Sequence, residues 1–160
     1  MTERREMYLE YKQELCAIDD IIPTEKDDRN YLANYDWMQD HPEVVEWVPI
    51  TTEGTEVGFI LISNYGDLDI MGDYDYRFDY FILDSYIEPA YRRQGLVEKA
   101  LRELLDRKPG TYGLYILKNN EPALNLWKKL WKTYPQTDEI ELIKDKSGQE
   151  YAFEVKGGSL

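Results

Sequence analysis

The stretch "RRQGLV", residues 92–97, combines residue types that suit anion binding. Arg92 and Arg93 stand just before Gly95, and an apolar run with helical spacing follows. A helix N-terminus exposes backbone N–H groups without partners and carries about half a positive charge. Guanidinium groups add charge, and a glycine lets a ligand approach the backbone closely. The stretch predicts a phosphate site at a helix start; the alternative is solvated arginines beside a simple turn.

This stretch matches neither of the common phosphate-binding glycine motifs. The Gly-x4-Gly-Lys-Ser/Thr pattern of nucleotide-binding loops is absent, and so is the three-glycine dinucleotide motif. The proposed anion site therefore belongs to another kind of fold.

A second stretch, residues 73–87, alternates aromatic or aliphatic residues with aspartate for much of its length. Period-two alternation is typical of a strand with one wet face, and it predicts a long central strand. Asp79 and Asp84 lie in this strand and would point to opposite faces unless a bulge intervenes. The acidic segment 67–79 would either attract a cationic ligand or serve solubility and block edge pairing.

The remaining pattern predicts the elements that position these stretches. Amphipathic spacing indicates helices over 3–20 and 25–40, with Thr24 as the N-cap of the second. The other expected elements are a hairpin over 45–63, a helix over 96–105, a strand over 111–117, a helix over 121–132 and a hairpin over 138–155 with "KSGQ" as its turn. This order predicts a mixed α/β fold around a partly antiparallel sheet, in a single domain over residues 1–160.

Composition excludes several functional classes. The chain has 160 residues, 32 Asp and Glu against 19 Lys and Arg, and a formal net charge of -13. Such a field repels phosphate backbones, so binding of nucleic acid by the whole surface is disfavoured, whereas cationic small molecules or basic peptides are favoured. The oligomeric state is not fixed by the sequence, and a homodimer is one of the states left open.

Cysteine and histidine usage also narrows the chemistry. Cys16 is the one cysteine and His41 the one histidine, so an internal disulfide and a multi-cysteine zinc site are excluded, and no metal is expected. No apolar run approaches the roughly 20 residues of a membrane span, and the N-terminal residues do not look like a secretory signal. We therefore expect a cytoplasmic protein.

The chain resembles the GCN5-related N-acetyltransferase (GNAT) family over about residues 44–155. The family signature is Arg or Gln, two residues, Gly, one residue, then Gly or Ala; Arg92 and Gly95 match its first two positions, and Val97 stands at the last. The preceding "YIEPAYR" resembles the family's run of hydrophobic residue, acidic residue, proline and aromatic-Arg. Downstream, "KNNEPALNLWKKLW" is similar to the family's pattern of Asn, Ala and an aromatic residue, here Asn120, Ala123 and Trp127.

Three features depart from the family pattern. Val97 stands where the family has Gly or Ala, which narrows the space beside a pyrophosphate. Trp127 stands where many members have a tyrosine that protonates the leaving thiolate, and an indole N–H is not an acid at neutral pH. The family's first strand is not evident, because the N-terminal residues have helical spacing.

The resemblance implies acetyl-CoA as co-substrate and direct transfer of its acetyl group to an amine. Backbone N–H groups of residues 92–97 would hold the pyrophosphate, and backbone near Tyr86 and Ile87 would pair with the pantetheine arm. The cofactor-binding residues implied are Tyr86, Ile87, Arg92, Arg93, Gln94, Gly95, Leu96, Val97, Asn120 and Trp127. For Trp127, a role in the core is the alternative.

The reaction needs a base, because only a neutral amine attacks a thioester. Asp84 is the first candidate base and Asp79 the second, with ordinary solvent-facing aspartates as the alternative. Tyr115, Tyr134 or water would replace the missing phenol as the acid. The leading hypothesis is an N-acetyltransferase that acts on a small-molecule or peptide amine; the alternative is a catalytically silent sensor or interaction module that binds CoA or an acyl-CoA.

Overall fold

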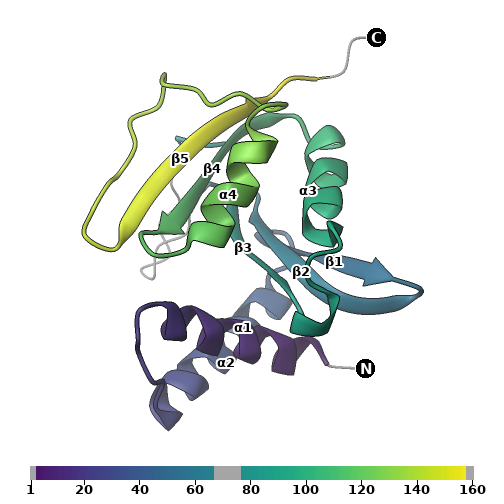
Figure 1. Cartoon of the computed structure of the whole chain (residues 1–160), viewed down its shortest axis with the longest axis vertical. Helices are drawn as coiled ribbons and strands as arrows, with labels where there is room; N and C mark the ends of the chain where they lie inside the picture. Colours follow the sequence, from purple (N-terminus) through teal and green to yellow (C-terminus); the bar gives the residue numbers. More distant parts are fainter. Residues whose placement is uncertain (1–2, 67–76, 158–160) are drawn as a thin grey trace.

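The computed structural model describes residues 3–66 and 77–157, and these form one sheet with helices on both faces (Figure 1). The helices are α1 (Arg4–Ile18), α2 (Glu25–Asp40), α3 (Leu96–Asp106) and α4 (Glu121–Leu130). The strands are β1 (Val45–Thr52), β2 (Thr55–Ser63), β3 (Tyr80–Ile87), β4 (Gly110–Leu117) and β5 (Gly148–Val155). The predicted mixed α/β fold, with two helices before the first described strand, is confirmed.

The strands follow the order β1-β2-β3-β4-β5 across the sheet. Three neighbouring pairs are antiparallel, whereas β3 and β4 run parallel, joined through the short 3-10 turn Pro89–Tyr91 and helix α3. The parallel ladder is short: it pairs Tyr80 to Ile82 with Tyr112 to Leu114 and ends there. Both strands continue beyond it, to Ile87 and Leu117, without pairing to each other, and we call these segments, 83–87 and 115–117, the splayed ends.

Local sequence signals explain several element boundaries. Thr24 caps α2, because its hydroxyl accepts from Asp27 N–H while the Asp27 carboxylate accepts from Thr24 N–H. The β1–β2 hairpin turns at Glu53 and Gly54, both with positive φ, as a tight two-residue turn requires. Both elements agree with their sequence predictions.

Two predicted elements differ in the structure. The strand expected over 73–87 begins only at Tyr80: residues 73–76 lie outside the described residues, and Asp79 bonds to the backbone and hydroxyl of Thr111. The hairpin expected over 138–155 has one strand, β5. Its other arm contacts β5 through an isolated bridge at Lys144 and a backbone bond from Glu150 N–H to Ile143 O, while Ile140 and Leu142 pack against a small core.

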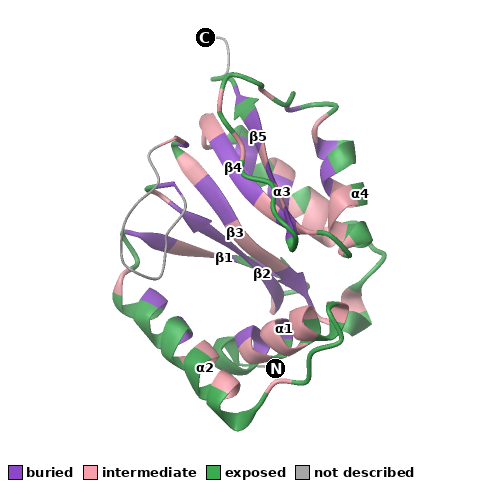
Figure 2. Cartoon of the chain, turned by 90° about the vertical axis from the view of Figure 1, so that its left-hand side faces the viewer, coloured by how far each residue is buried: buried purple, intermediate pink, exposed green. Residues whose placement is uncertain are grey.

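The helices form two layers on the sheet, with α3 and α4 on one face and α1 and α2 on the other (Figures 1 and 2). Under α3 and α4 lies the larger core, which includes Leu101, Leu104, Tyr112 and Trp127. The second core is richer in aromatic residues, which make up half of its buried side chains and include Tyr8, Tyr11, Phe59 and Tyr86. Within the described residues, no helix is long and apolar enough to cross a membrane.

Candidate functional site

The turn from β3 to α3 has the backbone geometry of an anion site. Arg93 and Gly95 have φ of 66° and 72°, a left-handed conformation that costs a non-glycine residue about 1 kcal/mol. No side chain caps α3, and its first internal hydrogen bond runs from Lys99 N–H to Gly95 O, at 3.0 Å. The N–H groups of the first helical turn are therefore available to a ligand.

The two arginines of the turn have different environments. Arg93 and Gln94 are exposed. Arg92, in contrast, donates through Nη2 to both carboxylate oxygens of Glu14, at 2.9 and 2.7 Å, and through Nε to Ile87 O, at 3.0 Å. Of the two guanidinium groups, that of Arg93 has the freedom to meet an anion above the turn.

A bulge marks the point where β3 leaves β4. Asp84 pairs with Leu61 and Ile82 with Ile62, so Leu83 has no partner on β2. Ile82 is also the last residue that pairs with β4. A bulge, named from the sequence only as a condition for changing side-chain direction, is present directly at the splayed ends.

Asp84 faces helix α1 and lies among phenols. Its Oδ1 accepts a short hydrogen bond from the hydroxyl of Tyr11. Burial raises the pKa of Asp84, while the charge of Lys12 and the Tyr11 hydroxyl act in the opposite direction. Lys12 Nζ lies 5.5 Å from the ring centroid of Tyr8 and 5.6 Å from that of Tyr11. A carboxylate with a raised pKa in such a place is suited to accept a proton.

The other predicted acid-base residues lie in three different places. Leu114 and Ile116 of β4 point into the core under α3 and α4, so Tyr115 between them faces the other side of the sheet, the side of Asp84. The Tyr115 hydroxyl donates to Asp145 Oδ1 at 2.5 Å. Burial and this hydrogen bond raise the pKa of Tyr115 to about 12. Tyr134 bonds to Asp106 at 2.6 Å on the α3 side. Asp79 lies before β3, five residues or roughly 16 Å along the chain from Asp84 at about 3.3 Å per residue. The structure thus brings Asp84 and Tyr115 to the same side of the sheet, whereas Asp79 and Tyr134 lie elsewhere.

Asn120 and Trp127 have local structural partners. Asn120 is the N-cap of α4, with Oδ1 accepting from Ala123 N–H at 3.3 Å. Trp127 is 3% exposed and packs against Phe153, with ring centroids 5.3 Å apart. The indole therefore lies in the core between α4 and the sheet.

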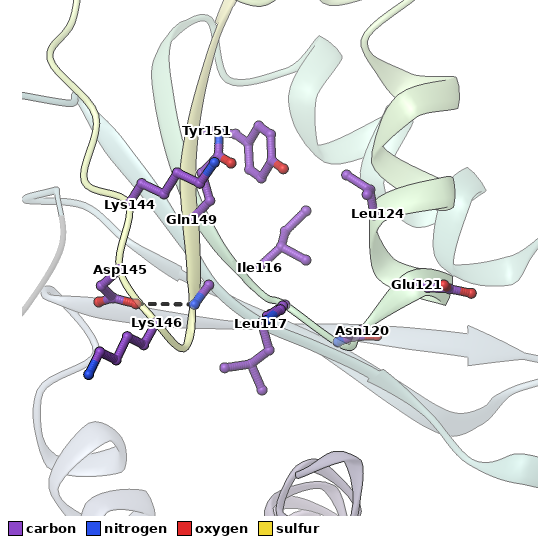
Figure 3. Close-up of a pocket in the computed structure, with 12 residues that line it drawn as sticks. Ile116, Leu117, Asn120, Glu121, Leu124, Lys144, Asp145, Lys146, Gln149 and Tyr151 are labelled. Atoms are coloured by element: carbon purple, nitrogen blue, oxygen red, sulfur yellow. Dashed lines mark hydrogen bonds between the residues drawn. The ribbon is translucent and has the colours of Figure 1, made fainter.

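A pocket of about 380 Å³ lies on the other side of β4, between α4 and β5 (Figure 3). Ile116, Leu124 and Tyr151 form its apolar wall, and Asn120 and Lys144 are on its rim. Because Ile116 and Tyr151 belong to the core under α4, this pocket opens on the face opposite Asp84.

Sequence reasoning missed three residues of the site, Tyr11, Lys12 and Glu14. All three lie in α1, and their partners Asp84 and Arg92 lie more than 70 residues later. The one available signal was the spacing of Tyr8 and Tyr11, three apart on one face of a helix. Within the described residues, no group of three potential ligands could hold a metal ion.

Known structures share the fold at low sequence identity. The PaiA N-acetyltransferase of Thermoplasma acidophilum, solved with coenzyme A, is 13% identical, with a TM-score of 0.62 over 94% of this chain and 89% of that chain. The ribosomal-protein-S18-alanine N-acetyltransferase of Escherichia coli is 15% identical, with a TM-score of 0.56 over 99% and 93%. An acetyltransferase of Thermus thermophilus is 13% identical, with a TM-score of 0.61 over 92% and 86%.

No curated protein sequence matches the chain significantly. The model of the acetyltransferase (GNAT) family matches residues 5–130, a span that contains both the turn at Gly95 and Asp84. It begins within α1 and ends with α4, so the N-terminal helices belong to the family match as well. The chain belongs to the GNAT acetyltransferase family.

Proposed function

We propose that the protein, acting as a single domain over residues 1–160, transfers the acetyl group of acetyl-CoA to an amine of a small molecule or a basic peptide. The observation that supports this most strongly is the uncapped start of α3 beside the splayed ends, with Asp84 at their bulge. An anion site and a base thus lie at the two ends of segment 83–87.

The turn fits a pyrophosphate. A Cβ placed on Gly95 would meet no atom within 4 Å, so open space lies beside the turn. The N–H groups of the first turn of α3 and the exposed side chain of Arg93 would hold the negative charge. The proposed cofactor-binding residues are Tyr86, Ile87, Arg92, Arg93, Gln94, Gly95, Leu96, Val97 and Asn120, with Tyr86 and Ile87 acting through backbone groups of the splayed end and Arg92 through its backbone.

The proton transfers are assigned to the side of the sheet that faces α1. Bound acetyl-CoA would supply the acetyl group as a thioester. Asp84 would take the proton of the attacking amine, a role that its raised pKa favours. Tyr115 is the candidate donor to the leaving thiolate, directly or through water. A thiolate with an ordinary pKa near 8.5 needs little assistance, so the absence of a phenol at Trp127 is tolerable.

The charge distribution favours a cationic acceptor. The protein has a net charge of -13, and the carboxylates of Asp19 and Asp145 both act on Tyr115 beside the splayed end of β4. Such a field raises the local concentration of ammonium groups.

A specific observation also supports the silent CoA-binding module. Trp127, at the position of the family's catalytic tyrosine, is buried in the core and offers no acid to the splayed ends. Both functions require acetyl-CoA binding, so only turnover separates them.

The test is a calorimetric titration with acetyl-CoA, followed by measurement of thiol release with polyamines, amino sugars, amino acids and basic peptides. Binding with release on one acceptor class supports the transferase. Binding without release on any class supports the silent module. Absence of binding contradicts both.

A further inference from the structure

Helix α1 is attached to the sheet unevenly along its length. Its buried residues are Met7, Tyr8 and Tyr11, all at or before its midpoint. After Tyr11, the described polar bonds of the helix go to α2, from Gln13 and Cys16, with one exception. That exception is Glu14, whose carboxylate holds Arg92 of the anion-binding turn.

The Glu14–Arg92 pair is a two-oxygen contact of opposite charges. Nη2 of Arg92 reaches Oε1 and Oε2 of Glu14 at 2.9 and 2.7 Å. The same guanidinium also bonds to Ile87 O, at the end of the splayed segment, and lies 5.5 Å from the ring centroid of Tyr86. One side chain therefore connects α1, β3 and the turn.

A continuous set of contacts runs from this pair to the candidate base. The rings of Tyr86 and Tyr11 meet edge to face, with centroids 5.7 Å apart, and Tyr11 donates to Asp84. Glu14 follows Tyr11 by three residues, nearly one helical turn, so the two side chains lie on one face of α1. Fixing Glu14 thus fixes the part of the helix that presents Tyr11 to Asp84.

We propose that Glu14 is a positioning residue that couples the cofactor turn to the acceptor side of the sheet. Binding of CoA at the turn immobilises Arg92, Arg92 holds Glu14, and α1 then keeps Tyr11 on Asp84. This inference rests on the proposed function in one respect, namely that the turn binds CoA. It assigns Arg92 a side-chain role toward α1, while the backbone of the turn and Arg93 face the anion.

The test compares Glu14→Gln with Glu10→Gln. The first variant keeps the shape of the side chain and removes its charge. The second removes an equal charge one turn earlier, from an exposed residue that also acts electrostatically on Tyr86. Hydrogen exchange of residues 13–18 is measured with and without CoA, after unfolding curves have shown that both variants fold.

In the wild type and in Glu10→Gln, CoA should slow exchange over 13–18 by about five-fold, the size that a well-oriented exposed ion pair supports. In Glu14→Gln this protection should disappear, while the Kd of CoA rises by no more than the same factor of about five, because the coupling is reciprocal. Equal protection in all three proteins overturns the proposal. A Kd raised about twenty-fold or more in Glu14→Gln also overturns it, because a loss well beyond the coupling factor would mean that Glu14 serves the cofactor site itself.

Turnover gives a second readout and separates this proposal from the proposed function. With the best acceptor, kcat/KM for the acceptor should fall about ten-fold in Glu14→Gln and stay unchanged in Glu10→Gln, since small displacements of catalytic groups are costly. If the wild type releases no thiol but shows CoA-dependent protection that Glu14→Gln lacks, the transferase fails and the coupling stands. If CoA does not bind, both fail.

Discussion

The two faces of the sheet are built from different kinds of side chain. Under α3 and α4 the core is largely aliphatic, and its phenols are bonded to nearby acceptors, as Tyr112 is to Lys108 O at 2.6 Å. Under α1 and α2 half of the buried side chains are aromatic, and this side includes the Tyr11–Asp84 bond. The first face therefore holds its phenols on local acceptors, whereas the second places a carboxylate with a raised pKa beside the splayed ends.

The largest effect that would test this contrast is expected for Asp84→Asn. If Asp84 is the base, kcat/KM for the acceptor should fall by roughly 10² to 10³. The wild-type rate should rise with pH through the raised pKa of Asp84, and the variant should lose that rise. Thiol release measured against pH checks both statements.

The same variant tests whether the Asp84 carboxylate lowers the free energy of unfolding. Because the pKa of Asp84 is raised on folding, its ionised form is less favourable in the folded state than in the unfolded state at neutral pH. Urea unfolding at pH 7 should therefore show Asp84→Asn to be as stable as the wild type or more stable, by about 1 kcal/mol. A large loss of stability would mean that the carboxylate serves the fold.

Trp127→Tyr tests the other face. The indole is buried against Phe153, so the smaller phenol should leave a cavity and an unpaired hydroxyl, lowering the free energy of unfolding by about 2 kcal/mol. Turnover at a temperature where the variant is folded should not rise. A gain in thiol release would show instead that the family's phenol can act from this position and that its absence limits catalysis.

Arg93→Glu addresses the turn between the two faces. A carboxylate beside the start of α3 should raise the Kd of acetyl-CoA about ten-fold, through the lost attraction and the new repulsion. Arg107→Glu is the matched control, because Arg107 is exposed and lies at the opposite end of the same helix. Equal increases in the Kd of acetyl-CoA for the two variants would mean that Arg93 acts only through the net charge of the protein and not as part of a local anion site.

The smallest effect is expected for Tyr11→Phe, which keeps the ring against Phe59, 5.6 Å between centroids, and removes only the hydroxyl. The bond stabilises the ionised form of Asp84, so its loss should move the pH dependence of kcat/KM to higher pH and lower the rate at pH 7 about three-fold. An unchanged pH profile would show that the Tyr11 hydroxyl has no part in the acid-base chemistry.

The sequence predicted what depends on local chemistry. Thr24 was recognisable as a helix N-cap, and Gly95 before an apolar run predicted the helix start with free N–H groups and its turn. The bulge at Leu83 could be named only as a condition under which the directions of Asp79 and Asp84 would change, because a bulge accepts any residue type and leaves no signal in the sequence. The missing strand near Ile140 depends on packing against a small core, which periodicity does not encode.

The site was predictable only in part for the same reason. Asp84 was found because it stands out in its strand, but its hydrogen-bond partner Tyr11 comes from α1, 73 residues earlier in the chain. Arg92 was expected near a phosphate from its motif, and its contact with Glu14, 78 residues away, had no signal in either local pattern. Long-range pairs of this kind follow from the fold, not from spacing.

The short parallel ladder has a mechanical consequence. One antiparallel unit, β1 to β3, and another, β4 with β5, are joined by only three residue pairs, Tyr80 to Ile82 with Tyr112 to Leu114. Among the described ladders this is the shortest, so a rotation of one unit against the other breaks the fewest backbone hydrogen bonds of any rearrangement of the sheet. A hinge motion of the sheet would therefore cost least at this seam, which ends beside the segment on which Asp84 lies.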